Sequence, residues 1–149
     1  MDKWDKRFML LAKLVSTFSK DPSTGVGSVI VDENQRIVST GFNGLPRQVA
    51  DSTDRLNNRE LRLALTLHAE QNAVLFAERS IRGTTCYVWP LPPCSRCAAL
   101  LIQAGVGRVV APEPGSQLAE RWGESIELAV MALREAGVQV DILDLEGIL

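Results

Sequence analysis

The sequence is poor in the side chains that bind metals through nitrogen or sulfur. Its single histidine is His68, and its three cysteines are Cys86, Cys94 and Cys97. An odd and small number of cysteines argues against a disulfide framework and, in a reducing compartment, favours metal binding or catalysis. Cys86 lies in a β-rich run beside Tyr87, where a small buried side chain is expected. A metal site made from the others therefore has almost no candidate for a fourth protein ligand of the usual kind.

Long apolar runs and an excess of basic charge are also missing. No apolar run approaches the roughly 20 residues of a membrane span, and the first residues lack the apolar core of a signal peptide. We therefore expect a cytoplasmic protein with no membrane partner. The formal net charge of −2 argues against a basic face for a nucleic-acid polymer. Any nucleotide partner is expected to be small and held in a pocket.

The length and the apolar patterning predict one α/β domain. A chain of 149 residues with 46% hydrophobic residues can bury one core, so a single domain is expected over residues 1–149. The order of elements predicts a three-layer α/β/α sandwich around a five-stranded mixed sheet. Residues 47–58 are polar, show no clear period and are expected to form a loop. Helices are expected at 3–19, 59–79, 95–104 and 118–136, and strands at 26–32, 36–40, 84–89, 108–111 and 138–143.

Two short segments carry the candidate metal chemistry. Glu70 follows His68 by two positions, and Pro93 directly precedes the Cys94-x-x-Cys97 pair. One imidazole and two thiolates make three protein ligands, the number typical of catalytic zinc, and leave a position for water. Zinc lowers the pKa of such a water to about 7. The pattern therefore predicts a Zn²⁺ site with Glu70 as the proton carrier.

The spacing of these residues constrains the local backbone. A Cys-x-x-Cys that opens a helix can turn both sulfurs to one side, and a helix N-terminus favours the thiolate form. Positions 68 and 70 of a regular helix would instead lie on nearly opposite faces. We therefore predict that His68 begins a helix and that the periodicity of residues 59–79 is interrupted around Thr66 and Leu67.

Taken together, these segments resemble the cytidine deaminase superfamily and, within it, the deoxycytidylate (dCMP) deaminases. The resemblance implies a cytidine deaminase-like fold and hydrolysis of dCMP, or of a C5-substituted dCMP, to dUMP and ammonia, which supplies dUMP for dTMP synthesis. The motifs that carry it are Ser19-Lys-Asp-Pro-Ser-Thr-Gly-Val-Gly27, Gly41-Phe-Asn-Gly44, His68-Ala-Glu-Gln-Asn-Ala73, Pro93-Cys-Ser-Arg-Cys-Ala98 and Leu101-Ile-Gln-Ala-Gly-Val106.

The resemblance also implies roles for individual residues. A zinc-activated water would attack C4 of cytosine, while Glu70 protonates N3 and then the departing amine. The backbone near Ala69 and Cys94 would bind the base carbonyl, and Asn43 would reach the sugar hydroxyl. Asn43 also suits a turn, for purely structural reasons. Val26 is a further expected substrate contact.

A 5′-phosphate requires charged donors, which the polar loop supplies. Arg47 is the first candidate, because it follows the turn that carries Asn43. Arg55, Arg59 and Lys20 are the other candidates, and each alone is also compatible with a solvated surface charge.

Three further expectations follow from the resemblance. Relatives form homo-oligomers, including hexamers, and apolar helix residues such as Leu75 and Leu101 suit either a core or an interface. Phe42 stands where tyrosine is commoner, which leaves open whether dCTP and dTTP act as allosteric ligands. Trp89 suits equally a stacking role and a core role.

Alternative functions share the same metal pattern. A deaminase of another nucleoside, of a free base or of a tRNA adenosine uses the same signature, although the acidic balance disfavours tRNA. A zinc-stabilised nucleotide-binding module without catalysis is the alternative outside the enzymes.

Overall fold

The computed structural model describes residues 2–144, so residues 1 and 145–149 of the expected domain lie outside the described part. Within it, one mixed sheet contains five strands in the order β2-β1-β3-β4-β5. β1 is antiparallel to β2 and β3, whereas β3, β4 and β5 are parallel. The bounds are β1 Gly27–Val31, β2 Ile37–Phe42, β3 Thr85–Trp89, β4 Arg108–Pro112 and β5 Gln139–Leu143.

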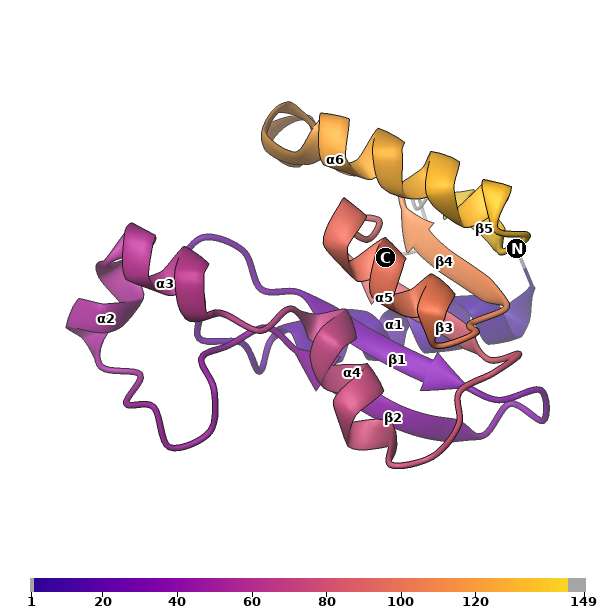
Figure 1. The fold of residues 1–149 in the computed structure, drawn as a ribbon, viewed down its shortest axis with the longest axis horizontal. Coiled ribbons are helices and arrows are strands. Elements are labelled where there is room, and N and C mark those ends of the chain that lie inside the picture. The colour runs from indigo at the N-terminus through magenta and orange to yellow at the C-terminus, as the bar shows by residue number, and fades with distance from the viewer. Residues whose placement is uncertain (1, 145–149) are drawn as a thin grey trace.

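Helices cover both faces of the sheet, which confirms the predicted α/β/α sandwich (Figure 1). One core lies between the sheet and α1, and the other lies between the sheet and α4, α5 and α6. No helix within residues 2–144 has both the length and the apolar character that a bilayer crossing requires. The helices are α1 Lys3–Ser16, α2 Thr53–Asn57, α3 Arg59–Leu65, α4 Ala69–Ala77, α5 Ser95–Gln103 and α6 Ser116–Glu135.

The two cores follow from the alternation of side chains along each strand. In β1, Val29 packs with Met9 of α1, whereas its neighbour Ile30 belongs to the core under α4, α5 and α6. In β3, Tyr87 likewise belongs to the core under α1, and its neighbour Val88 belongs to the core under α4, α5 and α6. Every residue of β1 is buried, as a central strand covered on both faces requires.

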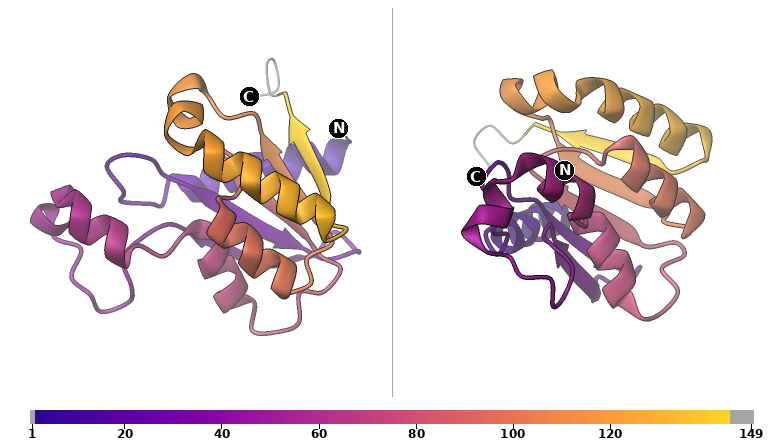
Figure 2. Two further views of the ribbon diagram at one scale, coloured as in Figure 1. Left: turned by 45° about the horizontal axis from the view of Figure 1, so that its top comes forward. Right: turned by 60° about the vertical axis from the view of Figure 1, so that its left-hand side comes forward.

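The segment from residue 47 to residue 79 differs from the expectation in two respects. The predicted loop contains the helix α2, which begins after the N-cap Ser52; with only five residues it is too short to show a helical period. The predicted helix 59–79 divides into α3 and α4. Thr66 is extended, with ψ of 125°, and Leu67 pairs with Gly44 in an isolated β-bridge. The predicted interruption at Thr66 and Leu67 is thus confirmed, and α2 and α3 project beyond the end of the sheet (Figure 2).

A partly buried charged cluster fastens α1 to β3, β4 and β5 on the face of the sheet that α1 covers. Asp5 is only 3% exposed, and both of its oxygens accept hydrogen bonds from Arg108 at 2.8 and 2.9 Å. The Tyr87 hydroxyl donates to Asp5 at 2.7 Å, and Arg108 Nε also donates to Asp141 at 2.7 Å. Burial by itself raises the pKa of Asp5, but the hydrogen bonds from Arg108 and Tyr87 outweigh it and lower the pKa below its ordinary value.

Candidate active site

The N-termini of α4 and α5 bring the predicted metal ligands together. His68 is the N-cap of α4, Cys94 is the N-cap of α5, and Cys97 lies in the first turn of α5. The Nδ1 atom of His68 lies 3.5 Å from Cys94 Sγ and 3.3 Å from Cys97 Sγ. A tetrahedral zinc with the usual Zn–S and Zn–N bond lengths separates sulfur from nitrogen by about 3.6 Å. The observed spacing of these donor atoms therefore fits a zinc ion.

The electrostatics around the two sulfurs are unequal. The hydrogen bond from the Cys97 thiol, and after it that with His68, lowers the pKa of Cys94 to about 4. Cys97 donates its proton to Cys94 and is fully buried, and both effects raise the pKa of Cys97. Zinc binds cysteine as the thiolate, so binding of a metal here would remove the proton of the Cys97 thiol.

Glu70 lies in the first turn of α4 and lines the same cavity as His68 and Cys94. Its side chain is only 4% exposed. Burial raises the pKa of Glu70 to about 7, because a low-dielectric surrounding disfavours the carboxylate. A carboxyl group with this pKa can accept and return a proton near neutral pH. Because His68 lies outside the helix as its cap, residues 68 and 70 reach the same cavity despite their spacing.

The site opens into a cavity of about 340 Å³, which is within the size range of small-molecule sites. Four of the predicted substrate contacts and candidates line it, namely Val26, Asn43, Arg59 and Ala69. Its walls come from the segment that precedes β1, from α3, from the N-termini of α4 and α5, and from the first turns of α6. The structure therefore gathers segments that are far apart in the sequence.

Asn43 is held firmly at the cavity wall. Its Oδ1 accepts the backbone N–H of Val26 at 2.8 Å, and its Nδ2 donates to the carbonyl of Thr24 at 2.9 Å. These bonds shape the loop that borders the cavity, so Asn43 has a structural task as well as a place in the lining. Its predicted contact with a sugar hydroxyl stays a prediction.

Three of the predicted phosphate candidates lie away from this cavity. Arg47 stacks over the ring of Phe76 on α4, with its guanidinium carbon 5.0 Å from the ring centre. Lys20 forms an exposed ion pair with Asp51 at 2.8 Å. Arg55 donates to the carbonyl of Ala50. None of the three belongs to the lining, because Phe76, Asp51 and the carbonyl of Ala50 engage these side chains elsewhere.

Sequence reasoning missed the wall that α6 contributes. Leu118, Arg121 and Trp122 line the cavity, and their spacing places them on one face of that helix. This spacing is visible in the sequence, but it cannot tell which helix face meets a cavity. Trp89, the tryptophan considered beforehand, packs against the core under α1.

Comparisons with known proteins agree with this site. The family model described as the cytidine and deoxycytidylate deaminase zinc-binding region matches residues 2–113. A protein of Aliivibrio fischeri, named an uncharacterized deaminase in the luxG 3′ region, is 48% identical over 147 residues, which cover 98% of this chain and 97% of that protein. The human deoxycytidylate deaminase is 35% identical over 114 residues, which cover 72% of this chain and 64% of the human one.

The fold is also similar to solved structures. The dCMP deaminase of the cyanophage S-TIM5, solved in complex with dCMP and dUMP, is 26% identical to this chain, and the two superpose with a TM-score of 0.73. The match covers 96% of this chain and 99% of the phage chain. The fold, the ligand cluster and the match over residues 2–113 together establish that the chain belongs to the cytidine and deoxycytidylate deaminase family.

Proposed function

We propose that this protein is a zinc-dependent deaminase that hydrolyses dCMP to dUMP and ammonia. The observation that carries the proposal is the cluster of His68, Cys94 and Cys97 beside the buried carboxyl group of Glu70, which lines the same cavity as His68 and Cys94. The named activity of the human relative and the dCMP and dUMP bound to the phage enzyme support the choice of substrate. The product dUMP would then serve dTMP synthesis.

His68, Cys94 and Cys97 would hold the zinc. Zinc in such a site acts as a Lewis acid that makes water a nucleophile at neutral pH. The number of protein ligands suits this role, because three ligands leave one coordination position of a tetrahedral zinc open for water or substrate. Among the described residues, no other group of three His, Cys, Asp or Glu side chains is placed to hold a metal.

Glu70 would carry the protons of the reaction. Water adds at C4 of the cytosine ring, and the carboxylate takes a proton from that water and passes it to N3. A second proton then goes through Glu70 to the amino group, which leaves as ammonia while the C4 carbonyl forms. The balance is dCMP plus water to dUMP plus ammonia. The raised pKa of Glu70, about 7, matches a group that must be both base and acid near neutrality.

A pair of matched variants tests the assignment of Glu70. Glu70→Gln keeps the shape of the side chain but removes its ability to accept and return a proton, so ammonia release from dCMP should fall about 10²–10⁴-fold. Zinc content, measured by mass spectrometry, should stay at the wild-type value. Glu78→Gln, at the exposed C-terminal end of α4, is the control and should keep full activity. Equal ammonia release by the Glu70 variant and the wild type would refute the assignment.

A substrate panel tests the choice of dCMP. Zinc-loaded protein would be given dCMP, 5-methyl-dCMP, dCTP, CMP, deoxycytidine and a tRNA stem-loop, and ammonia release would be measured for each. The proposal requires dCMP or its C5-substituted form to be the preferred substrate. Preference for the tRNA or for a free base would replace it with another deaminase function, and no turnover at all would favour a binding module.

A further inference from the structure

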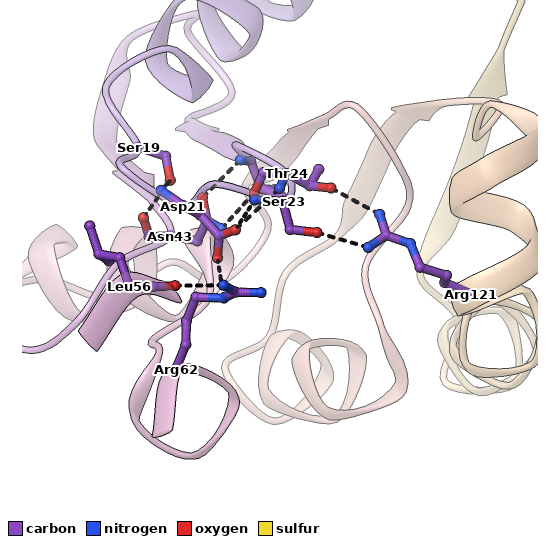
Figure 3. A network of polar contacts seen from close by, with 9 residues as sticks. Ser19, Asp21, Ser23, Thr24, Asn43, Leu56, Arg62 and Arg121 are labelled. Atoms are coloured by element: carbon purple, nitrogen blue, oxygen red, sulfur yellow. Dashed lines mark hydrogen bonds and ion pairs between the residues drawn. The ribbon is translucent and has the colours of Figure 1, made fainter. Parts of the chain in front are cut away.

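The N-terminal part of α6 places a cationic side chain at the rim of the cavity. Arg121 reaches from α6 to the loop that precedes β1, where one nitrogen donates to Ser23 Oγ at 2.9 Å and another donates to Thr24 Oγ1 at 3.1 Å (Figure 3). All three residues line the cavity that contains Glu70. Two segments almost 100 positions apart thus meet above the site through a guanidinium and two hydroxyl groups.

Arg121 differs from the neighbouring Arg62 in its counter-charge. Arg62 is nearly buried, lies 3.7 Å from the carboxylate of Asp21, and donates to the carbonyl of Leu56 at 2.6 Å. Its charge is therefore neutralised; the ion pair ties α3 to the loop before β1, and the hydrogen bond ties α3 to α2. Within residues 2–144, Arg121 forms no ion pair, and its side-chain hydrogen bonds go to the neutral hydroxyl groups of Ser23 and Thr24. Its charge is consequently available to an anionic ligand.

The two hydroxyl groups stand on a well-fixed loop. Asp21 Oδ1 accepts the backbone N–H groups of Ser23 and Thr24 at 2.8 and 3.2 Å, and the carbonyl of Thr24 accepts the amide of Asn43 at 2.9 Å. In the described part of the chain, neither hydroxyl donates its own proton to a protein acceptor. The guanidinium also has N–H groups beyond the two that it uses here. The cluster can therefore keep its internal bonds and still donate to a ligand.

We propose that Arg121, Ser23 and Thr24 form a clamp for the 5′-phosphate and make the enzyme select a nucleotide over its nucleoside. A phosphate oxygen accepts charge-assisted bonds from a guanidinium and further bonds from hydroxyl groups. The clamp is preorganised, because the hydroxyl groups already hold the guanidinium in place. It rests on the proposed function, in which the base lies near Glu70. The residue that carries the charge lies on α6, outside the matched region 2–113.

Binding of the product pair dUMP and deoxyuridine tests the clamp without turnover. Titration calorimetry on the zinc-loaded protein gives both dissociation constants for the wild type and for Arg121→Ala. A lost charged hydrogen bond at an exposed rim predicts dUMP binding about 10- to 100-fold weaker, with deoxyuridine binding unchanged. Arg121→Lys should restore part of the loss. Thr24→Val, which removes one hydroxyl at constant shape, should weaken dUMP binding by a smaller factor.

Arg134→Ala, at the other end of α6, is the matched control and should bind both ligands as the wild type does. Equal weakening of dUMP and deoxyuridine in Arg121→Ala, or no weakening of either, overturns the clamp. The proposed function is judged separately by ammonia release from dCMP by the wild type. An active enzyme whose Arg121 variant still distinguishes dUMP from deoxyuridine contradicts the clamp alone. An inactive protein whose Arg121 variant loses only dUMP binding contradicts the deaminase function alone.

Discussion

Replacing Gly41 by alanine is expected to damage the active site through the backbone of α4. Gly41 lies in β2, where α4 packs directly on the strand. A Cβ atom at this position would come closer than 3.0 Å to the carbonyl oxygen of Ala69 and to the nitrogen of Ala73. Both atoms belong to the backbone of α4, so neither can rotate away. The helix itself must shift, and it carries His68 as its N-cap and Glu70 in its first turn.

The size of the effect follows from this contact. Ordinary van der Waals contact begins at about 3.4 Å, so relief of the clash requires the first turns of α4 to move away from β2 by about 1 Å. Overpacking of this kind costs about 1–3 kcal/mol of unfolding free energy. A displacement near 1 Å at a catalytic group can cost about 10²-fold in rate. We therefore expect Gly41→Ala to lose about 10²-fold in kcat/KM and to unfold at a lower temperature.

The assay is ammonia release from dCMP, measured at a temperature where calorimetry shows the variant folded and zinc-loaded. Gly44→Ala is the first control, because a Cβ there meets nothing within 4 Å. Gly27→Ala is the second control. Its Cβ would clash with the backbone of α1 at Ala12 and Ser16, on the other face of the sheet. It should lower stability but leave kcat/KM of the folded protein nearly unchanged. Wild-type kcat/KM in folded Gly41→Ala would refute the argument.

Two further predictions concern the charged cluster and the metal. Asp5→Asn should lower the free energy of unfolding by about 2 kcal/mol at pH 7, because Arg108 keeps Asp141 as a partner. Since the pKa of Asp5 is lowered in the fold, this stabilisation is complete above its ordinary pKa of 3.8 and disappears as the pH falls through the folded-state value. Urea titrations should therefore show the two proteins converging in acid, and a constant difference at every pH would contradict the assignment. Removal of zinc by a chelator should abolish ammonia release and lower the unfolding temperature. One cooperative unfolding transition should remain, because neither hydrophobic core contains a candidate metal ligand. An unchanged unfolding temperature would argue against a metal bound at Cys94 and Cys97.

The sequence alone predicted the candidate metal ligands and Glu70, because local spacing limits which side chains can act together. A single histidine and one Cys-x-x-Cys left few choices for metal ligands, and the roles of His68 and Glu70 required a helix to begin between them. The interruption at Thr66 and Leu67 was therefore predictable against the apparent periodicity of residues 59–79. The order of strands and helices predicted the sandwich for the same reason, since periodicity along the chain reports which face of an element is buried.

Only the tertiary structure decided what surrounds the metal ligands. Arg47 was expected near a phosphate, yet its guanidinium lies over the ring of Phe76. The sequence could not predict this, because the composition of a loop does not determine the direction in which the loop runs. Arg121 is one of many charged residues in the sequence, and it becomes a candidate ligand only because α6 packs with its first turns over the loop at Ser23 and Thr24. Ligand residues close in sequence are fixed by local geometry, whereas a cavity wall forms from segments whose meeting depends on the packing of the whole chain.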